Sequence, residues 1–207
     1  MGSKKTRRGL LLLSGGIDSP VSGYLMKKLG VNIGAIHFSH EPVTDDEAEI
    51  KSKKLAKQLG FSPVYVIPFG ETLAYLSKTC DHRYYFIIMR RMMLRISERI
   101  AQKEGYDFLI TGENLGQVGS QTLENMKATD CAVKMHVLRP ILCNDKVETI
   151  NIAEKIGTFE ISKGPEIFAV LGPKHPVTKA KIETVLDEEK KIDVEKIVEE
   201  CVGKCRG

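Results

Sequence analysis

A loop with two adjacent glycines constrains this chain more than any other feature. The loop Ser14–Pro20 has the sequence SGGIDSP and directly follows the apolar run Leu10–Leu13. Where a buried strand turns through glycines into a helix, several backbone N–H groups point at one spot, and that spot attracts anions. The loop therefore predicts a site for phosphate groups.

The residue types in the loop suit this role. Gly15 and Gly16 can adopt positive φ and let a ligand approach the main chain, while Ser19 and Pro20 suit the N-cap and the first position of the helix that follows. Asp18 would repel a phosphate unless a divalent cation lies between them, so it predicts a nucleotide bound together with Mg²⁺. The alternative is a tight turn that binds no ligand. Two adjacent glycines followed by Asp-Ser-Pro are a more specific signal for a phosphate site than a lone glycine pair, so we favour the phosphate site.

Composition indicates a soluble globular chain. Its 207 residues suffice for one domain, or for one domain with a small appendage. No apolar run approaches the roughly 20 residues that would span a bilayer, and the basic start lacks the apolar stretch of a secretory signal. We therefore expect no membrane association and a cytoplasmic location.

Positive charge is clustered although the formal net charge is only +4. Such clusters can contact phosphate backbones, or they can simply form solvated faces. The clustered residues are Lys4, Lys5, Arg7, Arg8, Arg90, Arg91 and Arg95.

Five cysteines, an odd number, argue against a secreted disulfide framework. Cys201 and Cys205 form a Cys-x-x-x-Cys pair that would share one face of a helix, which permits redox or metal chemistry. Because the sequence offers no second ligand pair, we expect structural cysteines and no metal site built from protein ligands alone.

Strand-like and helix-like segments alternate about five times, which predicts an α/β fold: a parallel sheet with helices on both faces and ligands at the carboxyl ends of its strands. Thr44–Glu47 has the form of a capping box, and Asn144 that of an N-cap. The expected strands are Gly9–Leu13, Val31–Phe38, Val64–Ile67, Phe108–Thr111 and Val137–Arg139. The expected helices are Pro20–Leu29, one from Thr44 to about Gly60, Tyr84–Lys103, a short one near Gly116–Asn125, and Asn144–Ile156.

Three segments follow from this pattern: a basic tail over residues 1–8, the α/β domain over 9–176, and a charged helical segment over 177–207. The pattern is lost between Thr158 and Pro176. The content of Glu and Lys in the last segment suits a solvated surface helix or a lid.

Five segments, in matching order and spacing, resemble the tRNA 4-thiouridine synthetases, or ThiI proteins, within the larger group of PP-loop ATP pyrophosphatases. The glycine loop alone identifies only the larger group. The segments at 84–93 and 111–122 are what narrow the resemblance to the ThiI family. The segments are LLLSGGIDSP at 11–20, IHF at 36–38, YYFIIMRRMM at 84–93, TGENLGQVGSQT at 111–122, and LRPI at 138–141 leading to Asp145 and Lys146.

The resemblance implies an adenine nucleotide alpha hydrolase-like fold and an ATP-dependent tRNA sulfurtransferase. Members of this family adenylate the 4-oxygen of a tRNA uridine, after which a persulfide or sulfide sulfur displaces AMP. In many bacteria the same activity also supports thiazole synthesis for thiamine. The expected cofactors are ATP and Mg²⁺, and the expected partners are tRNA and a sulfur donor.

Resemblance also assigns nucleotide contacts, with the loop holding the pyrophosphate. Lys146 is our candidate for an electrostatic catalyst together with Asp18, because a lysine in the first turn of a helix requires a compensating anion, such as a phosphate. A solvated lysine is the alternative. The expected nucleotide-binding residues are Leu12, Leu13, Ser14, Gly15, Gly16, Ile17, Asp18, Ser19, His37, Phe38, Arg90, Gly112 and Gln121.

The chain departs from the family pattern in two respects. It starts almost at the first strand, so we expect it to lack the ferredoxin-like, THUMP and rhodanese parts of longer members. We further expect a separate THUMP-type tRNA-binding subunit and a homodimer. Phe168 stands where many relatives have a cysteine, and Phe86 and Met89 stand where archaeal relatives have a Cys-x-x-Cys pair.

Three explanations for the missing thiols stay open at this point. Sulfide or a partner's persulfide attacks the adenylate directly, Cys201 or Cys205 moves over the site, or the chain activates something other than tRNA uridine. Two other function classes stay open as well: a PP-loop enzyme acting on a small molecule, and a non-catalytic ATP-binding subunit.

Overall fold

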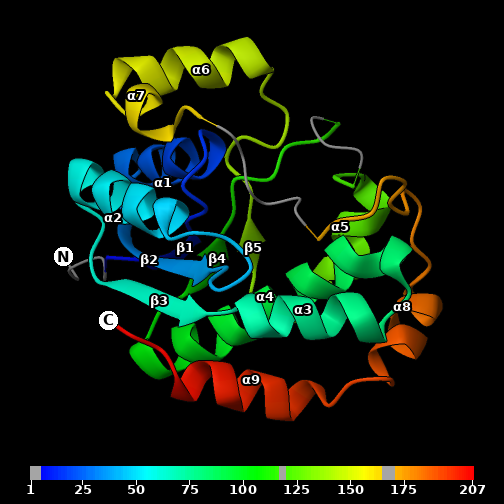
Figure 1. The fold of residues 1–207 in the computed structure, drawn as a ribbon. Helices are drawn as coiled ribbons and strands as arrows, with labels where there is room; N and C mark the ends of the chain where they lie inside the picture. The colour runs from blue at the N-terminus through cyan, green and yellow to red at the C-terminus, as the bar shows by residue number, and fades with distance from the viewer. Residues whose placement is uncertain (1–5, 117–119, 165–170) are drawn as a thin grey trace, which may run out of the picture.

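Five parallel strands form one sheet in the computed structural model, which describes residues 6–116, 120–164 and 171–207. Their order across the sheet is β3-β2-β1-β4-β5 (Figure 1). The strands are β1 (Arg8–Leu12), β2 (Asn32–Ser39), β3 (Val64–Pro68), β4 (Phe108–Ile110) and β5 (Val137–Leu138).

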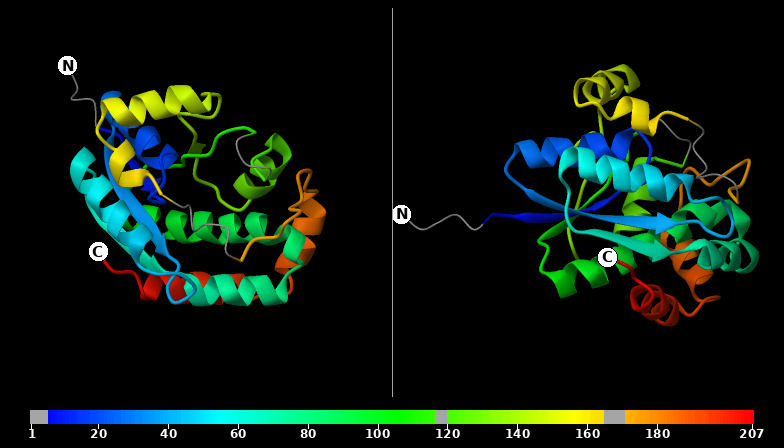
Figure 2. Two further views of the ribbon diagram at one scale, coloured as in Figure 1. Left: turned by 45° about the horizontal axis from the view of Figure 1, so that its top comes forward. Right: turned by 60° about the vertical axis from the view of Figure 1, so that its left-hand side comes forward.

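Helices cover both faces of this sheet, as the sequence predicts. Figures 1 and 2 show α1 and α2 on one face, with α6 and α7 outside them, and α3, α4 and α9 on the other, while α5 and α8 pack against α4. The helices are α1 (Asp18–Lys28), α2 (Glu47–Leu59), α3 (Gly70–Thr79), α4 (Tyr85–Glu104), α5 (Leu123–Asp130), α6 (Lys146–Lys155), α7 (Phe159–Ser162), α8 (Ile182–Glu189) and α9 (Val194–Gly203).

Burial explains why the strands are continuous apolar runs. Leu10 and Leu11 of β1 point to opposite faces of the sheet, and both are fully buried. Leu10 belongs to the cluster that includes α4, whereas Leu11 belongs to a second cluster with Ala56 of α2. A strand that is covered on both faces needs apolar residues at successive positions.

The start of α1 differs from the prediction. The helix begins at Asp18 and its N-cap is Ile17, so Ser19 is not the cap. The Ser19 hydroxyl instead accepts a hydrogen bond from the backbone N–H of Ser14 at 3.1 Å. The serine thus closes the glycine loop and does not begin the helix.

Two other predicted helix starts also require correction. The capping box at Thr44–Glu47 does not form, because α2 begins at Glu47 and the Thr44 hydroxyl donates to the carbonyl of Asp45. The cap of α6 is Asp145, which accepts from the N–H of Glu148 at 2.6 Å, and not Asn144.

Several helices lie outside the predicted bounds. Helix α3 was not predicted from the sequence. The helix expected near Gly116–Asn125 is α5, which begins at Leu123 after the cap Thr122. One helical turn, α7, interrupts the stretch from Thr158 to Pro176 that was expected to be irregular.

The C-terminal segment forms surface helices with exposed charged faces, as predicted, and because their apolar faces pack into the domain the segment is not a lid. Its helices α8 and α9 both contact α4, and Val185, Val198 and Cys201 belong to the same buried cluster as α4. Arg206 then pairs by backbone hydrogen bonds with Val66 of β3.

A buried ion-pair cluster holds α8 against α4 and corrects one charge prediction. Arg91, which is 1% exposed, and Arg95 both donate to the carboxylate of Glu189. These two arginines are therefore neutralised inside the protein and form no surface for phosphate backbones. The predicted tail residues Lys4 and Lys5 lie outside the described residues.

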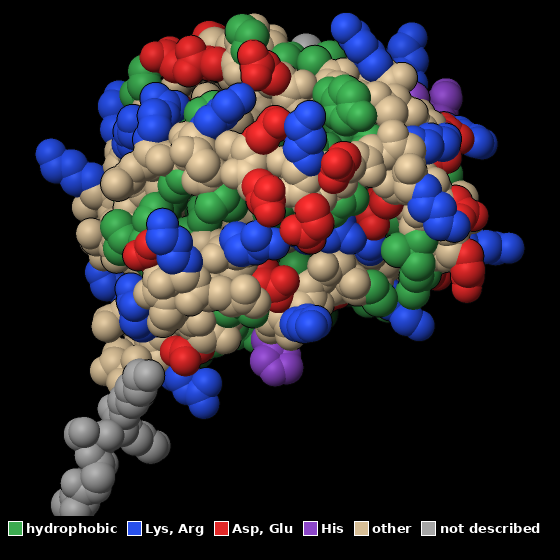
Figure 3. Space-filling view, turned by 90° about the horizontal axis from the view of Figure 1, so that it is seen from below, with side chains coloured by type: hydrophobic (Ala, Val, Ile, Leu, Met, Phe, Trp, Pro, Cys, Tyr) green, Lys and Arg blue, Asp and Glu red, His purple; other side chains and the backbone are tan. Residues whose placement is uncertain are grey.

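The face along α9 carries charges of both signs. Figure 3 shows this face from below, with Lys and Arg side chains interspersed with Asp and Glu. Among the helices of the described part of the chain, none combines the length and the apolar character needed to cross a bilayer.

Candidate functional site

A cavity of about 280 Å³ lies at the carboxyl ends of β1, β2 and β4, where an α/β sheet is expected to bind its ligands. All the predicted nucleotide-binding residues line it. Lys146, the predicted catalyst, does not. The lining residues are Leu12, Leu13, Ser14, Gly15, Gly16, Ile17, Asp18, Ser19, His37, Phe38, His40, Glu47, Ala48, Lys51, Phe86, Arg90, Met93, Leu94, Thr111, Gly112, Glu113, Ser120, Gln121, Thr129 and Ser162.

The glycine loop is held in shape by its own serines. Gly15 has a φ of 84°, which favours glycine, whereas Gly16 does not adopt a positive φ. The N–H of Gly16 donates to the Ser14 hydroxyl at 3.3 Å, and the hydroxyls of Ser14 and Ser19 lie 3.2 Å apart. From α7, the Ser162 hydroxyl donates to the carbonyl of Gly16 at 3.3 Å. The loop is therefore an ordered turn between β1 and α1.

Gly112 allows the end of β4 to approach the start of α1. A Cβ atom at this position would lie 2.5 Å from the backbone nitrogen of Ser19 and 2.7 Å from its Cα. The sequence analysis expected this glycine to admit a ligand. The residue lines the cavity, but the backbone of α1 is what a larger side chain would meet.

His37 is anchored at the base of the cavity. Its Nδ1 lies 2.8 Å from the carbonyl oxygen of Leu13 and 2.9 Å from the hydroxyl of Ser52. Burial lowers the pKa of His37, and burial together with His37 lowers the pKa of His40 to about 4. At neutral pH both imidazoles are therefore uncharged, and because a carbonyl only accepts, Nδ1 of His37 carries the proton.

Phe38 and Gln121 each have a structural partner as well as a place in the cavity wall. Phe38 packs edge-on against Phe69 with ring centroids 5.1 Å apart. The side-chain oxygen of Gln121 accepts from the backbone N–H of Asn114 at 3.0 Å. That bond fixes the amide of Gln121, so its remaining donors have a defined direction.

Among the described residues, three cation–carboxylate pairs lie in or beside the cavity wall. Lys51 Nζ lies 2.8 Å from Glu47 Oε1, and Arg90 Nη1 lies 3.4 Å from Glu113 Oε1. The third pair joins Lys146 Nζ and Asp18 Oδ1 at 3.8 Å, so Lys146 reaches the site through the aspartate of the loop. The compensating anion that its helix position requires is thus Asp18.

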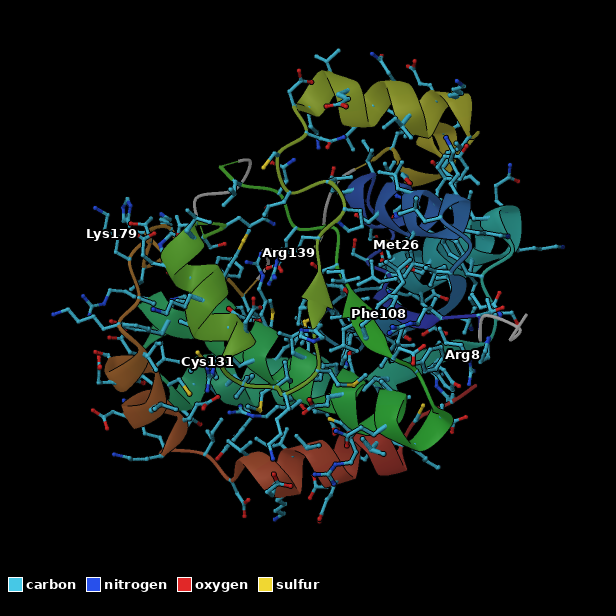
Figure 4. All side chains as sticks on the ribbon, turned by 180° about the vertical axis from the view of Figure 1, so that it is seen from behind. Arg8, Met26, Phe108, Cys131, Arg139 and Lys179 are labelled. Carbon is cyan, nitrogen blue, oxygen red and sulfur yellow. The ribbon has the colours of Figure 1, made fainter. Side chains whose placement is uncertain are left out.

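Glu113 is the centre of a larger charge network. Its Oε2 accepts from Arg139 Nε at 2.9 Å and from the hydroxyl of Thr111 at 3.2 Å. Arg139, labelled in Figure 4, also donates two bonds to the carboxylate of Asp130 on α5. Burial alone would lower the pKa of Arg139, but Asp130 and Glu113 raise it above its ordinary value. The network fixes Glu113, and through it Arg90, at the cavity.

The sequence analysis missed several members of this site. Glu113 lies in the segment 111–122 that carries the family resemblance, and an acidic residue next to Gly112 was a usable signal. Glu47 and Lys51 are spaced as an ordinary ion pair on a helix surface, and that spacing does not reveal that the helix faces a cavity.

All five cysteines are among the described residues, and none of them lines the cavity. Cys201 is 4% exposed and its Sγ lies 3.6 Å from the Thr72 hydroxyl. Cys205 precedes the residue that pairs with β3, and burial raises the pKa of both thiols. Neither Cys201 nor Cys205 lies at the cavity in this structure, so the explanation in which one of them moves over the site requires a rearrangement of the C-terminal segment. Phe168 lies outside the described residues.

Sequence comparison gives a consistent set of relatives. The family model described as Thiamine biosynthesis protein (ThiI) matches residues 4–194. The chain is similar to a "Probable tRNA sulfurtransferase" of Caldanaerobacter subterraneus subsp. tengcongensis, with 44% identity over 93% of the chain and 52% of the relative. It is also similar to one of Finegoldia magna, with 43% identity over 94% of the chain and 51% of the relative. The chain thus spans about half the length of the curated relatives that it matches.

Structure comparison agrees. A crystal structure of a 4-thiouridine synthetase–RNA complex with bound ATP matches with a TM-score of 0.91 and 34% identity, covering 97% of this chain and 54% of that one. NMN synthetase from Francisella tularensis matches with a TM-score of 0.61 and 17% identity, over 95% of this chain and 77% of that one, and shares the fold. With a family model matched over most of its length and relatives above 40% identity, the chain belongs to the ThiI family.

Proposed function

We propose that this chain is the adenylating domain of an ATP-dependent tRNA sulfurtransferase that forms 4-thiouridine in the cytoplasm. The observation that carries the proposal is the cavity. Residues from four of the five segments that resemble the family, all predicted to contact a nucleotide, line it together. The relatives' names supply the nucleic acid and the sulfur chemistry.

The cavity suits ATP in shape and polarity. Leu12, Leu13 and Phe38 offer an apolar slot for the base beside the backbone of His37, and Gln121 offers amide donors for polar base or ribose atoms. The Ser14–Ser19 loop, at the start of α1, faces the phosphates with its N–H groups and the positive end of the helix dipole.

Asp18 is the residue that would hold Mg²⁺. Among the described residues, no group of three or more His, Cys, Asp or Glu side chains is placed to bind a metal alone. Mg²⁺ commonly uses one or two carboxylates together with substrate phosphates, so the single loop carboxylate fits this mode. When bound, the ion would neutralise phosphate charge.

Lys146 is the proposed electrostatic catalyst. In the adenylation step the 4-oxygen of uridine forms a bond to the α-phosphorus, and the bond to the β-phosphate oxygen breaks to release pyrophosphate. Charge accumulates on the α-phosphate oxygens during this step, and a fixed ammonium group beside them lowers the barrier. The pair with Asp18 keeps Nζ at the loop before the substrate arrives.

The second step needs sulfur from outside the chain. Hydrosulfide attacks C4 of the adenylated uridine and AMP leaves. When the donor is the persulfide of another protein, the same attack leaves a C4–S–S link to the donor, and a second thiol of that donor breaks it, which forms a disulfide on the donor and releases 4-thiouridine. The absence of cysteine from the described cavity wall and the raised pKa values of Cys201 and Cys205 support an external donor. We include in the proposal that the same sulfur transfer also supports thiamine biosynthesis, as the description of the family model indicates.

Binding of tRNA is proposed to involve a THUMP-type part that lies on another chain or beyond this sequence. The support for this is that the chain spans only about half the length of its relatives. A homodimer stays a prediction.

The direct test is a reconstituted reaction. The chain, alone and together with a THUMP-containing tRNA-binding protein, is incubated with tRNA, α-labelled ATP, Mg²⁺ and sodium sulfide. The released AMP and the 4-thiouridine content of the digested tRNA are measured. We expect AMP release that requires tRNA, and its loss in Asp18→Asn. AMP release that is equal without tRNA would contradict the proposal and favour a small-molecule substrate.

A further inference from the structure

Helix α2 contributes Lys51 to the cavity wall, and neither step of the proposed reaction gives this lysine a role. Glu47, Ala48 and Lys51 share one face of the first turns of α2, and all three line the cavity. The side chain of Lys51 is 17% exposed, whereas that of Lys53, two positions further on, is 56% exposed. Lys51 therefore belongs to the cavity wall, and Lys53 belongs to the surface.

Lys51 lies against the glycine loop. A Cβ atom added to Gly15 would stand 3.5 Å from Lys51 Cβ, so the stem of the lysine packs on the loop backbone. At its other end, Nζ lies 2.9 Å from the position of a Cβ at Gly164, which follows α7. The ammonium group is thus enclosed between the loop and the chain beyond α7.

The partner of Lys51 leaves capacity for a ligand. An ammonium group has three N–H donors, and the described contacts give it one carboxylate oxygen, Glu47 Oε1 at 2.8 Å. Glu47 fixes the direction of Nζ and lowers the cost of keeping the charge in a partly desolvated place. A fixed cation beside a loop of backbone N–H groups is the arrangement that binds phosphate oxygens.

We propose that Lys51 binds the β- and γ-phosphates of ATP and stabilises the pyrophosphate that leaves. This inference rests on the proposed function, in which the Ser14–Ser19 loop holds those two phosphates and Lys146 acts at the α-phosphate. Since Lys51 packs on Gly15 of the loop and Lys146 pairs with Asp18, each cation takes a different part of the triphosphate. Of the two reaction products, pyrophosphate therefore contacts Lys51 and AMP does not.

The test compares two lysines of the same helix. Binding of inorganic pyrophosphate and of AMP, each with Mg²⁺, is measured by titration calorimetry for the wild type, Lys51→Met and Lys53→Met. Lys53 is the matched control, because it pairs with Glu49 four residues earlier, as Lys51 pairs with Glu47. Thermal unfolding of each variant shows whether the fold is retained.

Lys51→Met is expected to weaken pyrophosphate binding about tenfold or more, since a charge-assisted hydrogen bond is lost. Its AMP affinity is expected to stay within about twofold of the wild type, and Lys53→Met is expected to change neither. Unchanged pyrophosphate binding in Lys51→Met, or an equal loss of AMP and pyrophosphate binding, would overturn the inference while leaving the proposed function intact. A wild type that binds neither AMP nor pyrophosphate would overturn the proposed function as well.

Discussion

Lys146 and Asp18 face each other as the first residues of two helices, with Nζ 3.8 Å from Oδ1. The position of Asp18 at the start of α1 is favourable in the helix dipole, whereas a lysine at the start of α6 is unfavourable. The pair joins α6 to the glycine loop. A substitution of Lys146 therefore tests a charge that is unfavourable at the start of its own helix and lies beside the loop.

Lys146→Met is expected to lower the rate of adenylation about a hundredfold, because a charge that stabilises the transition state is removed. The affinity for ATP is expected to change little, since the loop and the other cavity residues stay in place. Single-turnover formation of AMP with saturating ATP and tRNA measures the rate. Lys155→Met, in the last turn of the same helix and exposed, is the control. A similar rate loss in both variants would show that α6, and not the charge, matters.

Glu189 is expected to be a strong determinant of stability. Glu189→Gln leaves the guanidinium groups of Arg91 and Arg95 without their counter-ion in a buried place, at a cost of about 3 kcal/mol in the free energy of unfolding. Glu195→Gln breaks the exposed pair between Arg99 and α9 and is expected to cost less than about 1 kcal/mol. Urea unfolding of the two variants and the wild type gives both values, and equal losses would contradict this account of α8.

The same carboxylate gives the fold an acid dependence. Burial alone would raise the pKa of Glu189, but Arg91 and Arg95 lower it from 4.5 to about 2. Since the pKa in the folded state is below that in the unfolded state, the stabilisation is present above about pH 4.5 and is lost as the pH falls toward 2. The free energy of unfolding should therefore fall over this range, and the fall should be smaller in Glu189→Gln. If the free energy of unfolding fell equally with pH in the wild type and in Glu189→Gln, the ion pairs of Glu189 with Arg91 and Arg95 would not be the cause.

Thiol labelling is expected to separate the cysteines by burial. Cys131, labelled in Figure 4, and Cys143 are exposed, whereas Cys80 and Cys201 are buried. Burial raises the pKa of Cys80 to about 11, so its thiolate is scarce at neutral pH. Iodoacetamide followed by peptide mass spectrometry should modify the first two in the native protein and the last two only after unfolding. Rapid labelling of Cys201 in the native protein would show that its thiol becomes accessible, and would support the hypothesis that Cys201 carries sulfur to the site.

The sheet and the loop were predictable because their signals are local. The glycine pair after Leu10–Leu13 and the alternation of apolar runs with helical patterns depend on neighbours in sequence. The strand β1 and the long helix α4 accordingly lie within a residue or two of their expected bounds. Helix α3 was missed because Gly70 and the aromatic residues around it give no clear start signal.

The rest required three-dimensional information. Ser19 and Asn144 have the residue types of N-caps, but Ser19 has a partner in the loop, Ser14, and the neighbour Asp145 caps α6. The pairing of Arg91 with Glu189 spans 98 positions in the chain, and no spacing rule connects them. The same applies to the network of Glu113 and Arg139, which depends on β4 and β5 lying side by side.

The central claim is that the glycine loop binds the phosphates of ATP at the carboxyl ends of β1, β2 and β4. A crystal structure with a non-hydrolysable ATP analogue and Mg²⁺ tests it most directly. The account predicts phosphate density over Ser14–Ser19 and the adenine ring beside Phe38. Density for the analogue elsewhere, or a loop that stays closed by its own side chains at saturating analogue, would contradict it.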